Sequence, residues 1–240
     1  MKTPYKLTPL HDWHQHHGGQ LSDVNGWIRV TSYGDLKSEL DTARQLVAVC
    51  DVTPLSKIDI QGQHSNDLLV KVSACTMRGI GRCMSIRSLD EEFTQAYAVQ
   101  VTSERFLVLS ASEQRQQLCN RLTFAAREWE CVHVTDMTSA YAAIRVVGPL
   151  STKLLKKLGP APVDMMGSDQ CVQTTIARVL NVLVRHNGET PAWLLLTARD
   201  YGEYVWDCIM AAGQEFGIRP FGISAERVLM REEASSVAVV

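Results

Sequence analysis

The sequence predicts an α+β fold made of two similar halves, and three observations support this prediction. The segments RFLVLSASE (105–113) and AWLLLTARD (192–200) match in residue type 87 positions apart. Upstream, QGQHSNDLL (61–69) and VGPLSTKLL (147–155) share a glycine, a serine and a pair of leucines. The spacers between extended segments are too short for regular βα alternation, which favours antiparallel sheets. We therefore expect two pseudo-repeated units of the ferredoxin-like or split kind around a central cleft.

Each half follows the same order of elements. It begins with a β-rich run, LSKIDI or AAIRVV, which meets Gly62 or Gly148, where a turn opens an amphipathic helix. Extended segments follow, and Ser112 and Asp200 are the expected N-caps of a closing helix. Apolar residues at helical spacing define the buried face of the two closing helices: Leu118, Leu122 and Ala125 in one, and Val205, Ile209 and Ala212 in the other.

The segments outside the duplication predict two further helices, one from about residue 36 to 47 and a short one from about 223 to 232. Neither terminal segment carries enough apolar residues to fold alone. We expect two domains. The first is discontinuous and combines residues 1–52 with 137–240, and the second spans residues 53–136.

Composition excludes several classes of function. The formal charge is −2 and the pI is about 6.4, so no strong field attracts nucleic acid or an acidic membrane. No apolar stretch approaches the roughly 20 residues that span a bilayer, and the first residues do not form a signal peptide. The seven cysteines are scattered and odd in number, which favours reduced thiols. We expect a cytoplasmic protein that binds neither nucleic acid nor membrane.

Four of the seven histidines, at positions 11, 14, 16 and 17, fall in the stretch TPLHDWHQHHGGQL. His14 and His17 are one helical turn apart and, with His11, could ligate zinc or nickel. Leu10 and Trp13 already supply the buried face of a short helix, however, and the sequence specifies no second shell of ligand partners. A solvated helix face without a metal is the favoured interpretation.

Several of these segments together resemble the aminomethyltransferase family, the T-protein of the glycine cleavage system. They are TPLHDWHQHHGG, SYGDLKSELDTARQLVAVCDVTPLSKIDIQG, YAAIRVVGP and IRPFGISAERVLMREEA, in the order and spacing of that family. The resemblance covers nearly the whole chain. It implies a tetrahydrofolate-binding protein of one-carbon metabolism, with the folate in a channel between the halves, and a short form that lacks the family's C-terminal barrel domain.

The chain departs from the family at its catalytic acids. Thr94 and Gln95 stand where the resemblance places a pair of aspartates, one of which positions the reacting folate amine. Neither side chain can ionise, whereas a carboxylate is needed there to stabilise positive charge and manage a proton. A replacement acid from Asp90, Glu91 or Glu92 is the alternative, although three adjacent charges more often form a solvated loop.

The remaining folate-binding candidates also follow from the resemblance. The family's pterin-gripping glutamate falls near Trp193 to Leu195, and its pocket arginine falls at Met230, with Arg231 one place along. The expected folate-binding residues are therefore Gln95, Ser110, Trp193 and Arg231. Trp193 is in step with Phe106, which favours core packing over stacking on a pterin. Arg231 could bind a folate tail or lie on a solvated helix edge beside Arg227.

Two hypotheses of function follow. In the first, the chain is an aminomethyltransferase-like protein that binds tetrahydrofolate only weakly and whose catalytic acids are lost. In the second, it is a non-catalytic subunit or scaffold that resembles the gamma subunit of sarcosine oxidase, with a protein partner in a multi-subunit complex. Adjacent genes for glycine cleavage or oxidase subunits would distinguish the two.

Overall fold

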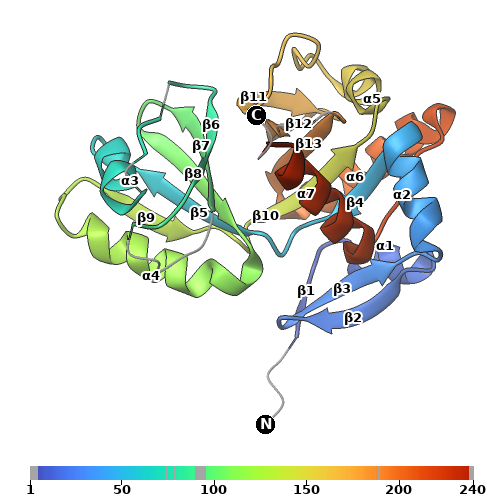
Figure 1. Cartoon of the computed structure of the whole chain (residues 1–240), viewed down its shortest axis with the longest axis horizontal. Coiled ribbons are helices and arrows are strands. Elements are labelled where there is room, and N and C mark those ends of the chain that lie inside the picture. Colours follow the sequence, from blue (N-terminus) through green and yellow to red (C-terminus); the bar gives the residue numbers. More distant parts are fainter. Residues whose placement is uncertain are drawn as a thin grey trace. The chain divides into compact units, whose positions relative to one another are not determined.

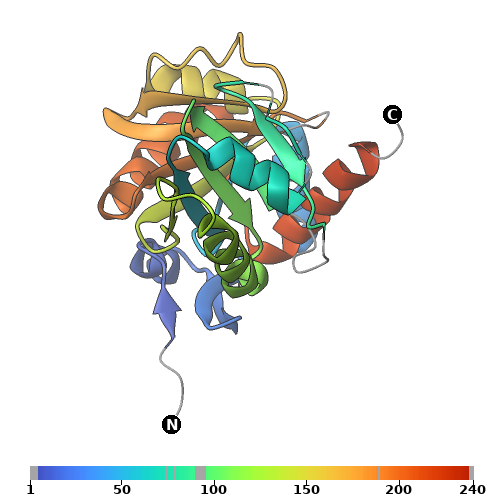
Figure 2. The same cartoon turned by 90° about the vertical axis from the view of Figure 1, so that its left-hand side faces the viewer.

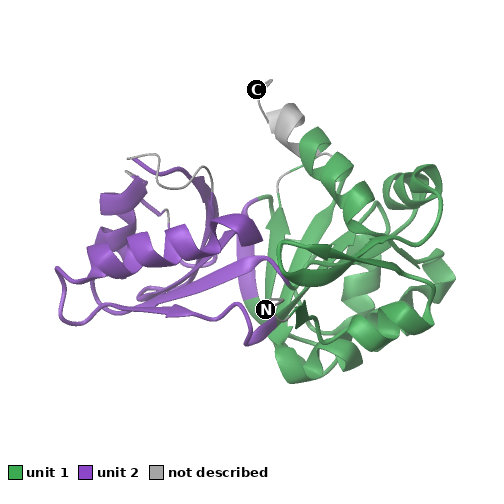
Figure 3. Ribbon diagram, turned by 90° about the horizontal axis from the view of Figure 1, so that it is seen from below, with its two compact units in different colours: residues 1–53, 142–168, 173–240 green, residues 54–141, 169–172 purple. Residues whose placement is uncertain are grey.

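The computed structural model describes residues 5–73, 75–77, 79–89, 96–186, 188 and 190–237. Helices and strands are mixed along the chain and form several sheets, which confirms the predicted α+β class (Figure 1). The chain divides into two compact units (Figure 3). Unit 1 comprises residues 1–53, 142–168 and 173–240, and unit 2 comprises residues 54–141 and 169–172. No helix in the described ranges is long and apolar enough to cross a membrane.

Unit 2 contains a five-stranded sheet in the order β6-β7-β8-β5-β9, with every neighbouring pair antiparallel. Its strands are β5 (Ser56–Gln61), β6 (Cys83–Ile86), β7 (Ala96–Thr102), β8 (Arg105–Ser110) and β9 (His133–Asp136). Two helices pack on one face, α3 (Ser65–Ser73) and α4 (Arg115–Ala126), and both are visible in Figure 2.

The core of unit 2 follows from strand alternation. Every second residue of a strand points to the same face of a sheet. Ile58 and Ile60 of β5 and Phe106 and Val108 of β8 are buried together with apolar residues of α3 and α4. The residues between them, which include Lys57 and other polar side chains, therefore point to the second face.

Unit 1 contains a six-stranded sheet in the order β11-β12-β13-β10-β4-β14 and a smaller sheet in the order β1-β3-β2. The six strands are β4 (Ala48–Asp51), β10 (Tyr141–Val147), β11 (Gln170–Ile176), β12 (Val179–His186), β13 (Ala192–Ala198) and β14 (Arg219–Pro220). The first residue of β10 and residues 170–172 of β11 are assigned to unit 2. The smaller sheet consists of β1 (Lys6–Leu7), β2 (Gln20–Val24) and β3 (Trp27–Ser32). Five helices complete the described part of the unit: α1 (His11–His16), α2 (Leu36–Gln45), α5 (Ser151–Leu158), α6 (Gly202–Gly213) and α7 (Ile223–Val237).

The internal duplication is visible in the positions of the elements. Helices α4 and α6 begin and end 87 residues apart, and each follows a one-turn 3₁₀ helix, η1 (Ser112–Gln114) or η2 (Arg199–Tyr201). The five strands of unit 2 have counterparts in the same order in unit 1, which adds β14 at one edge. The predicted caps were wrong, because Ser112 and Asp200 lie within the 3₁₀ turns η1 and η2. The residues at the N-caps of α4 and α6 are Gln114 and Tyr201.

Strands β4 and β9 are a further equivalent pair, each followed by the same turn. The backbone N–H of Thr53 donates to Oδ1 of Asp51, and that of Thr138 donates to Oδ1 of Asp136, both at 2.9 Å. Each strand precedes one repeat in sequence but pairs with the first strand of the other: β4 with β10 and β9 with β5. The two repeats therefore exchange strands.

Candidate functional site

The sequence-predicted site residues fall in different parts of the chain. Thr94 and Gln95, and the acidic residues 90–92, lie outside the described residues. Ser110 is buried at the end of β8 in unit 2, where its Oγ donates to the carbonyl of Ala111 at 3.4 Å. Trp193 and Arg231 belong to unit 1, the first in β13 and the second on α7.

Trp193 is fully buried, and its ring faces the guanidinium of Arg185 at 5.4 Å. Its equivalent in unit 2, Phe106, packs with α3 and α4. Arg231 is exposed. Met230, which stands at the family's arginine position, instead places its sulfur against a guanidinium nitrogen of Arg145.

The strongest group of polar side chains in unit 2 lies on the second face of its sheet. We call Lys57, Asp59, Tyr97 and Arg105 the polar sheet face. Adjacent strands carry these residues, and Lys57, Asp59 and Tyr97 are each in register with Leu107 or Leu109 of β8. The sequence analysis missed this group, although the segment SKIDIQ indicates it. The two isoleucines of this segment predict one apolar face of a strand, and the lysine and aspartate that alternate with them predict a polar opposite face.

An ion pair organises one end of the polar sheet face. Arg105 Nε donates to Oδ1 of Asp59 at 2.9 Å, and a second guanidinium nitrogen of Arg105 donates to the Tyr141 hydroxyl at 3.3 Å. Burial disfavours the charge on Arg105, but the hydrogen bond to Asp59 and the charge of that carboxylate outweigh it and raise the pKa of the guanidinium. The other oxygen of Asp59 accepts from the amide of Gln61. Both oxygens of this carboxylate therefore have protein partners.

Lys57 contributes a buried amino group to the polar sheet face. Its side chain is fully buried, and Nζ donates to the carbonyls of Leu55 at 2.9 Å and Thr138 at 3.2 Å. Its backbone N–H donates to the Thr138 hydroxyl at 3.1 Å. A buried ammonium needs such acceptors, because its desolvation is costly. These contacts fix the Lys57 side chain.

Tyr97 completes the polar sheet face. Its hydroxyl donates to Oδ1 of Asp169 at 2.6 Å. Burial, together with the nearby Cys83 and Asp169, raises the pKa of Tyr97, so this phenol stays protonated and acts as a donor. The carboxylates that contact this face, Asp59 and Asp169, are therefore both engaged by protein donors.

In unit 1, a buried arginine of the six-stranded sheet contacts α7. Arg145 of β10 is buried, and its Nη1 donates to Oε1 of Glu226 at 3.0 Å. His186, at the end of β12, has its pKa lowered to about 3, first by burial and then by the charge of Arg145. The ring of His186 is therefore neutral near pH 7.

The histidine cluster does not form a uniform solvated face, so that part of its interpretation was wrong. His14 is buried, with Nε2 3.2 Å from Oδ2 of Asp51 and Nδ1 2.5 Å from the Tyr33 hydroxyl. The ring of His17 stacks on Trp13 at 3.8 Å. Within the described ranges, no group of three or more His, Cys, Asp or Glu side chains is arranged to hold a metal ion. His14 therefore links α1 to β4 and to Tyr33, the residue that follows β3.

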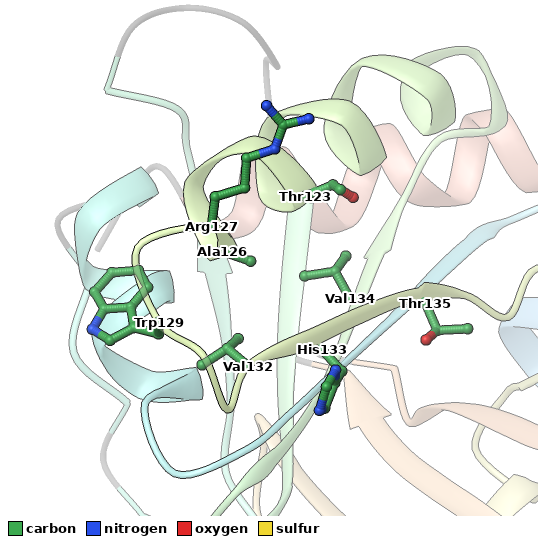
Figure 4. Close-up of a pocket in the computed structure, with 8 residues that line it drawn as sticks. All are labelled: Thr123, Ala126, Arg127, Trp129, Val132, His133, Val134 and Thr135. Carbon is green, nitrogen blue, oxygen red and sulfur yellow. The ribbon is translucent and has the colours of Figure 1, made fainter.

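A shallow hollow of about 320 Å³ lies between the end of α4 and β9 (Figure 4). Its lining is Thr123, Ala126, Arg127, Trp129, Val132, His133, Val134 and Thr135. The guanidinium of Arg127 points away from the side chains of Val132 and Val134. None of the residues predicted to bind folate lines this hollow.

Comparison with known proteins gives a consistent set of relatives. A family model described as the GCVT N-terminal domain matches residues 10–238. Sarcosine oxidase subunit alpha of Corynebacterium sp. (strain U-96) is 26% identical over 264 residues, which cover 96% of this chain and 26% of that protein. An aminomethyltransferase of Streptomyces avermitilis is 27% identical over 232 residues, which cover 94% of this chain and 62% of that protein.

The fold has a solved counterpart. The crystal structure of glycine cleavage system aminomethyltransferase T from Bartonella henselae matches with a TM-score of 0.82 at 14% sequence identity. The match covers 92% of this chain and 60% of that one. The chain thus spans about a quarter of the oxidase subunit and less than two thirds of the aminomethyltransferases.

Proposed function

Because this chain belongs to the family of the GCVT N-terminal domain, we propose that it binds tetrahydrofolate weakly and transfers aminomethyl groups slowly or not at all. The observation that carries this proposal is the pair Thr94-Gln95. By the resemblance described above, these neutral residues stand where the family's aminomethyltransferases carry two aspartates. Without a carboxylate at that place, positive charge on the reacting folate nitrogen has no counter-ion, and its proton has no acceptor.

The described residues also fit the pterin ring poorly. The edge of the pterin presents several donors and needs a carboxylate or comparable acceptor. Around the family's glutamate position, Trp193 to Leu195 are apolar and buried. On the polar sheet face, Asp59 already accepts from Arg105 and Gln61. We therefore expect one buried donor group of the pterin to lose its acceptor, which costs roughly 1–3 kcal/mol, and we assign no reaction step to the bound folate.

Calorimetric titration with tetrahydrofolate tests the binding part of the proposal. We expect a dissociation constant about 10- to 100-fold above that of an aminomethyltransferase titrated in parallel, because about 1.4 kcal/mol corresponds to a factor of ten. Leu195→Glu, which puts a carboxylate near the family's glutamate position, should tighten binding if it folds, whereas Leu195→Gln should do so less. Binding by the unmodified chain as tight as that of the reference enzyme would contradict the proposal.

A second candidate function is that of a subunit in a larger assembly. The similarity to a protein named as sarcosine oxidase subunit alpha favours it, because that name describes one component of a multi-subunit enzyme. In this case the chain would be a non-catalytic subunit, and a partner chain would contain the catalytic residues. Purification of the tagged chain at native expression level, followed by mass determination of the intact complex, tests it. A stoichiometric partner chain supports this function, and a monomer without a partner contradicts it.

A further inference from the structure

Cys83 and Cys171 lie on two short segments of unit 2 that pair with each other, one around residue 82 and the other at residues 169–172. Arg82 and Gln170 form an isolated antiparallel bridge. On one side of it, the backbone N–H of Cys83 donates to the carbonyl of Asp169 at 2.9 Å. On the other side, the N–H of Cys171 donates to the carbonyl of Gly81, also at 2.9 Å. Cys83 and Cys171 are therefore diagonal neighbours on two paired segments that lie far apart in sequence.

Both thiols lie on the same face of this pairing. Side chains alternate between faces, so the residues after Arg82 and Gln170 share the face opposite to them. The two cysteines are 6% and 7% exposed. Sγ of Cys171 donates to the carbonyl oxygen of Gln100 at 3.4 Å, and each of the two thiols shifts the pKa of the other through a hydrogen bond between them.

The contact gives the two thiols unequal acidity. The hydrogen bond to Cys171, followed by burial, raises the pKa of the Cys83 thiol. The hydrogen bond from Cys83 lowers the pKa of Cys171 more than burial raises it. The two neighbouring thiols therefore differ in acidity, and Cys171 is the more acidic member of the pair.

We propose that Cys83 and Cys171 form a redox pair that closes an intramolecular disulfide when the chain meets a low-molecular-weight disulfide such as oxidised glutathione. The Cys171 thiolate attacks one sulfur of oxidised glutathione, forms a mixed disulfide and releases one glutathione thiolate. Cys83 then passes its proton to the released glutathione thiolate and attacks Sγ of Cys171, which releases the second glutathione as a thiolate. In total, two protein thiols are oxidised to one disulfide, and one oxidised glutathione is reduced to two thiols.

The disulfide would fasten residues 169–172 to β6. In the reduced chain this segment is held by the bridge at Gln170 and by the hydrogen bond from Tyr97 to Asp169. Both contacts are reversible, whereas the disulfide would close a covalent ring from position 83 to 171. Such a ring restricts the unfolded chain, so the oxidised form should be the more stable one. Tyr97, a member of the polar sheet face, would be fixed with it.

Oxidation of the purified chain with oxidised glutathione tests the proposal. Peptide mapping should find a Cys83–Cys171 disulfide, and the titratable thiols of the denatured protein should fall from seven to five. Because the pair is buried, we expect the reaction to be slow. The melting temperature should rise by roughly 5–10 °C and return to its starting value with dithiothreitol. Cys131→Ser, which changes an exposed cysteine, should leave the disulfide and the shift intact.

Variants of the pair sharpen the test. In Cys83→Ser, oxidation should stop at glutathione attached to Cys171, and the shift in melting temperature should be absent. The measurements on the unmodified chain stand even if this variant does not fold. Seven remaining thiols after prolonged oxidation, a disulfide between other cysteines, or a stable mixed disulfide at Cys171 beside a free Cys83 would each overturn the proposal.

Discussion

The carboxylate of Asp51 is a shared hydrogen-bond partner for several residues in the N-terminal part of unit 1. Its carboxylate accepts from the Thr53 backbone N–H at 2.9 Å and lies 3.2 Å from Nε2 of His14. Burial alone would raise its pKa, but the hydrogen bond and charge of His14 and the bond from Thr53 prevail and lower it. His14 in turn contacts Tyr33, so one carboxylate connects α1, β4 and the residue that follows β3.

Replacing this carboxylate should destabilise the protein in a pH-dependent way. Asp51→Asn should lower the free energy of unfolding by about 1–3 kcal/mol near pH 7, because a buried donor on His14 loses its charged acceptor. Since the pKa of Asp51 is lower in the folded chain than its ordinary value of 3.8, its stabilising contribution is full above that value and is lost as the pH falls below it. Urea unfolding at about pH 6 and about pH 3.5 measures both effects.

Measurement at two pH values separates the contribution of the Asp51 charge from other effects of the substitution. Near pH 6 the full difference between the unmodified chain and Asp51→Asn should appear, and near pH 3.5 it should shrink. The control is Asp207→Asn, at an exposed position of α6, which should change little at either pH. A difference that stays constant down to the lower pH would show that the Asp51 charge does not contribute as described.

At the scale of single residues, the sequence predicted some features and missed others. Core packing of Trp193 followed from its match to Phe106, and both side chains are fully buried. The polar sheet face was missed because Lys57, Asp59 and Arg105 acquire their meaning only when two strands are paired in register. The role of His14 was missed for a related reason, because Asp51 lies 37 residues away in sequence.

At the scale of elements, Gly62 and Gly148 test the duplication, because both have a positive φ and both approach another backbone segment closely. They occupy equivalent turns after β5 and β10, with φ of 128° and 124°. A Cβ on Gly62 would lie 1.7 Å from the carbonyl oxygen of Cys131, and one on Gly148 would lie 2.4 Å from that of Leu46. Both obstacles are backbone atoms, which side-chain rotation cannot relieve.

Alanine at either glycine should therefore cost about 3 kcal/mol or more in stability. Gly62→Ala and Gly148→Ala should have similar effects, measured by chemical unfolding. Gly26→Ala is the matched control, since Gly26 also has positive φ but a Cβ added there would have nothing within 4 Å. It should lose about 1 kcal/mol from backbone strain alone. Equal losses at all three positions would contradict the role of close backbone approach.

The order of elements was predictable from the sequence, whereas their exchange between repeats was not. Local patterns predicted the helix that begins at Leu36 and the helix that begins at Ile223, although the second runs on to Val237. The sequences DVT and DMT mark equivalent turns after β4 and β9. They do not indicate that β4 pairs with β10 and β9 with β5, because strand partners are chosen by long-range packing rather than by local propensity.

At the scale of the whole molecule, the expected domain division at residues 53 and 136 predicts independent local stability. Phe106→Leu should speed amide hydrogen exchange mainly within residues 53–136, and Trp193→Leu should speed it mainly in the rest of the chain. Each change opens a cavity in one core, and separate cores open separately. Hydrogen-exchange mass spectrometry measures this. Equal acceleration throughout the chain by either variant would show a single cooperative domain.

The aminomethyl-transfer rate, measured beside an aminomethyltransferase of the same family, tests the central proposal most directly. Neutral residues at Thr94 and Gln95 predict a rate lower by about 10² to 10³ for the unmodified chain. The double substitution Thr94→Asp with Gln95→Asp should recover part of that loss, and Thr94→Asn with Gln95→Asn, of equal size but uncharged, should not. Turnover by the unmodified chain at the rate of the reference enzyme would contradict the proposal and would mean that another acid performs the role.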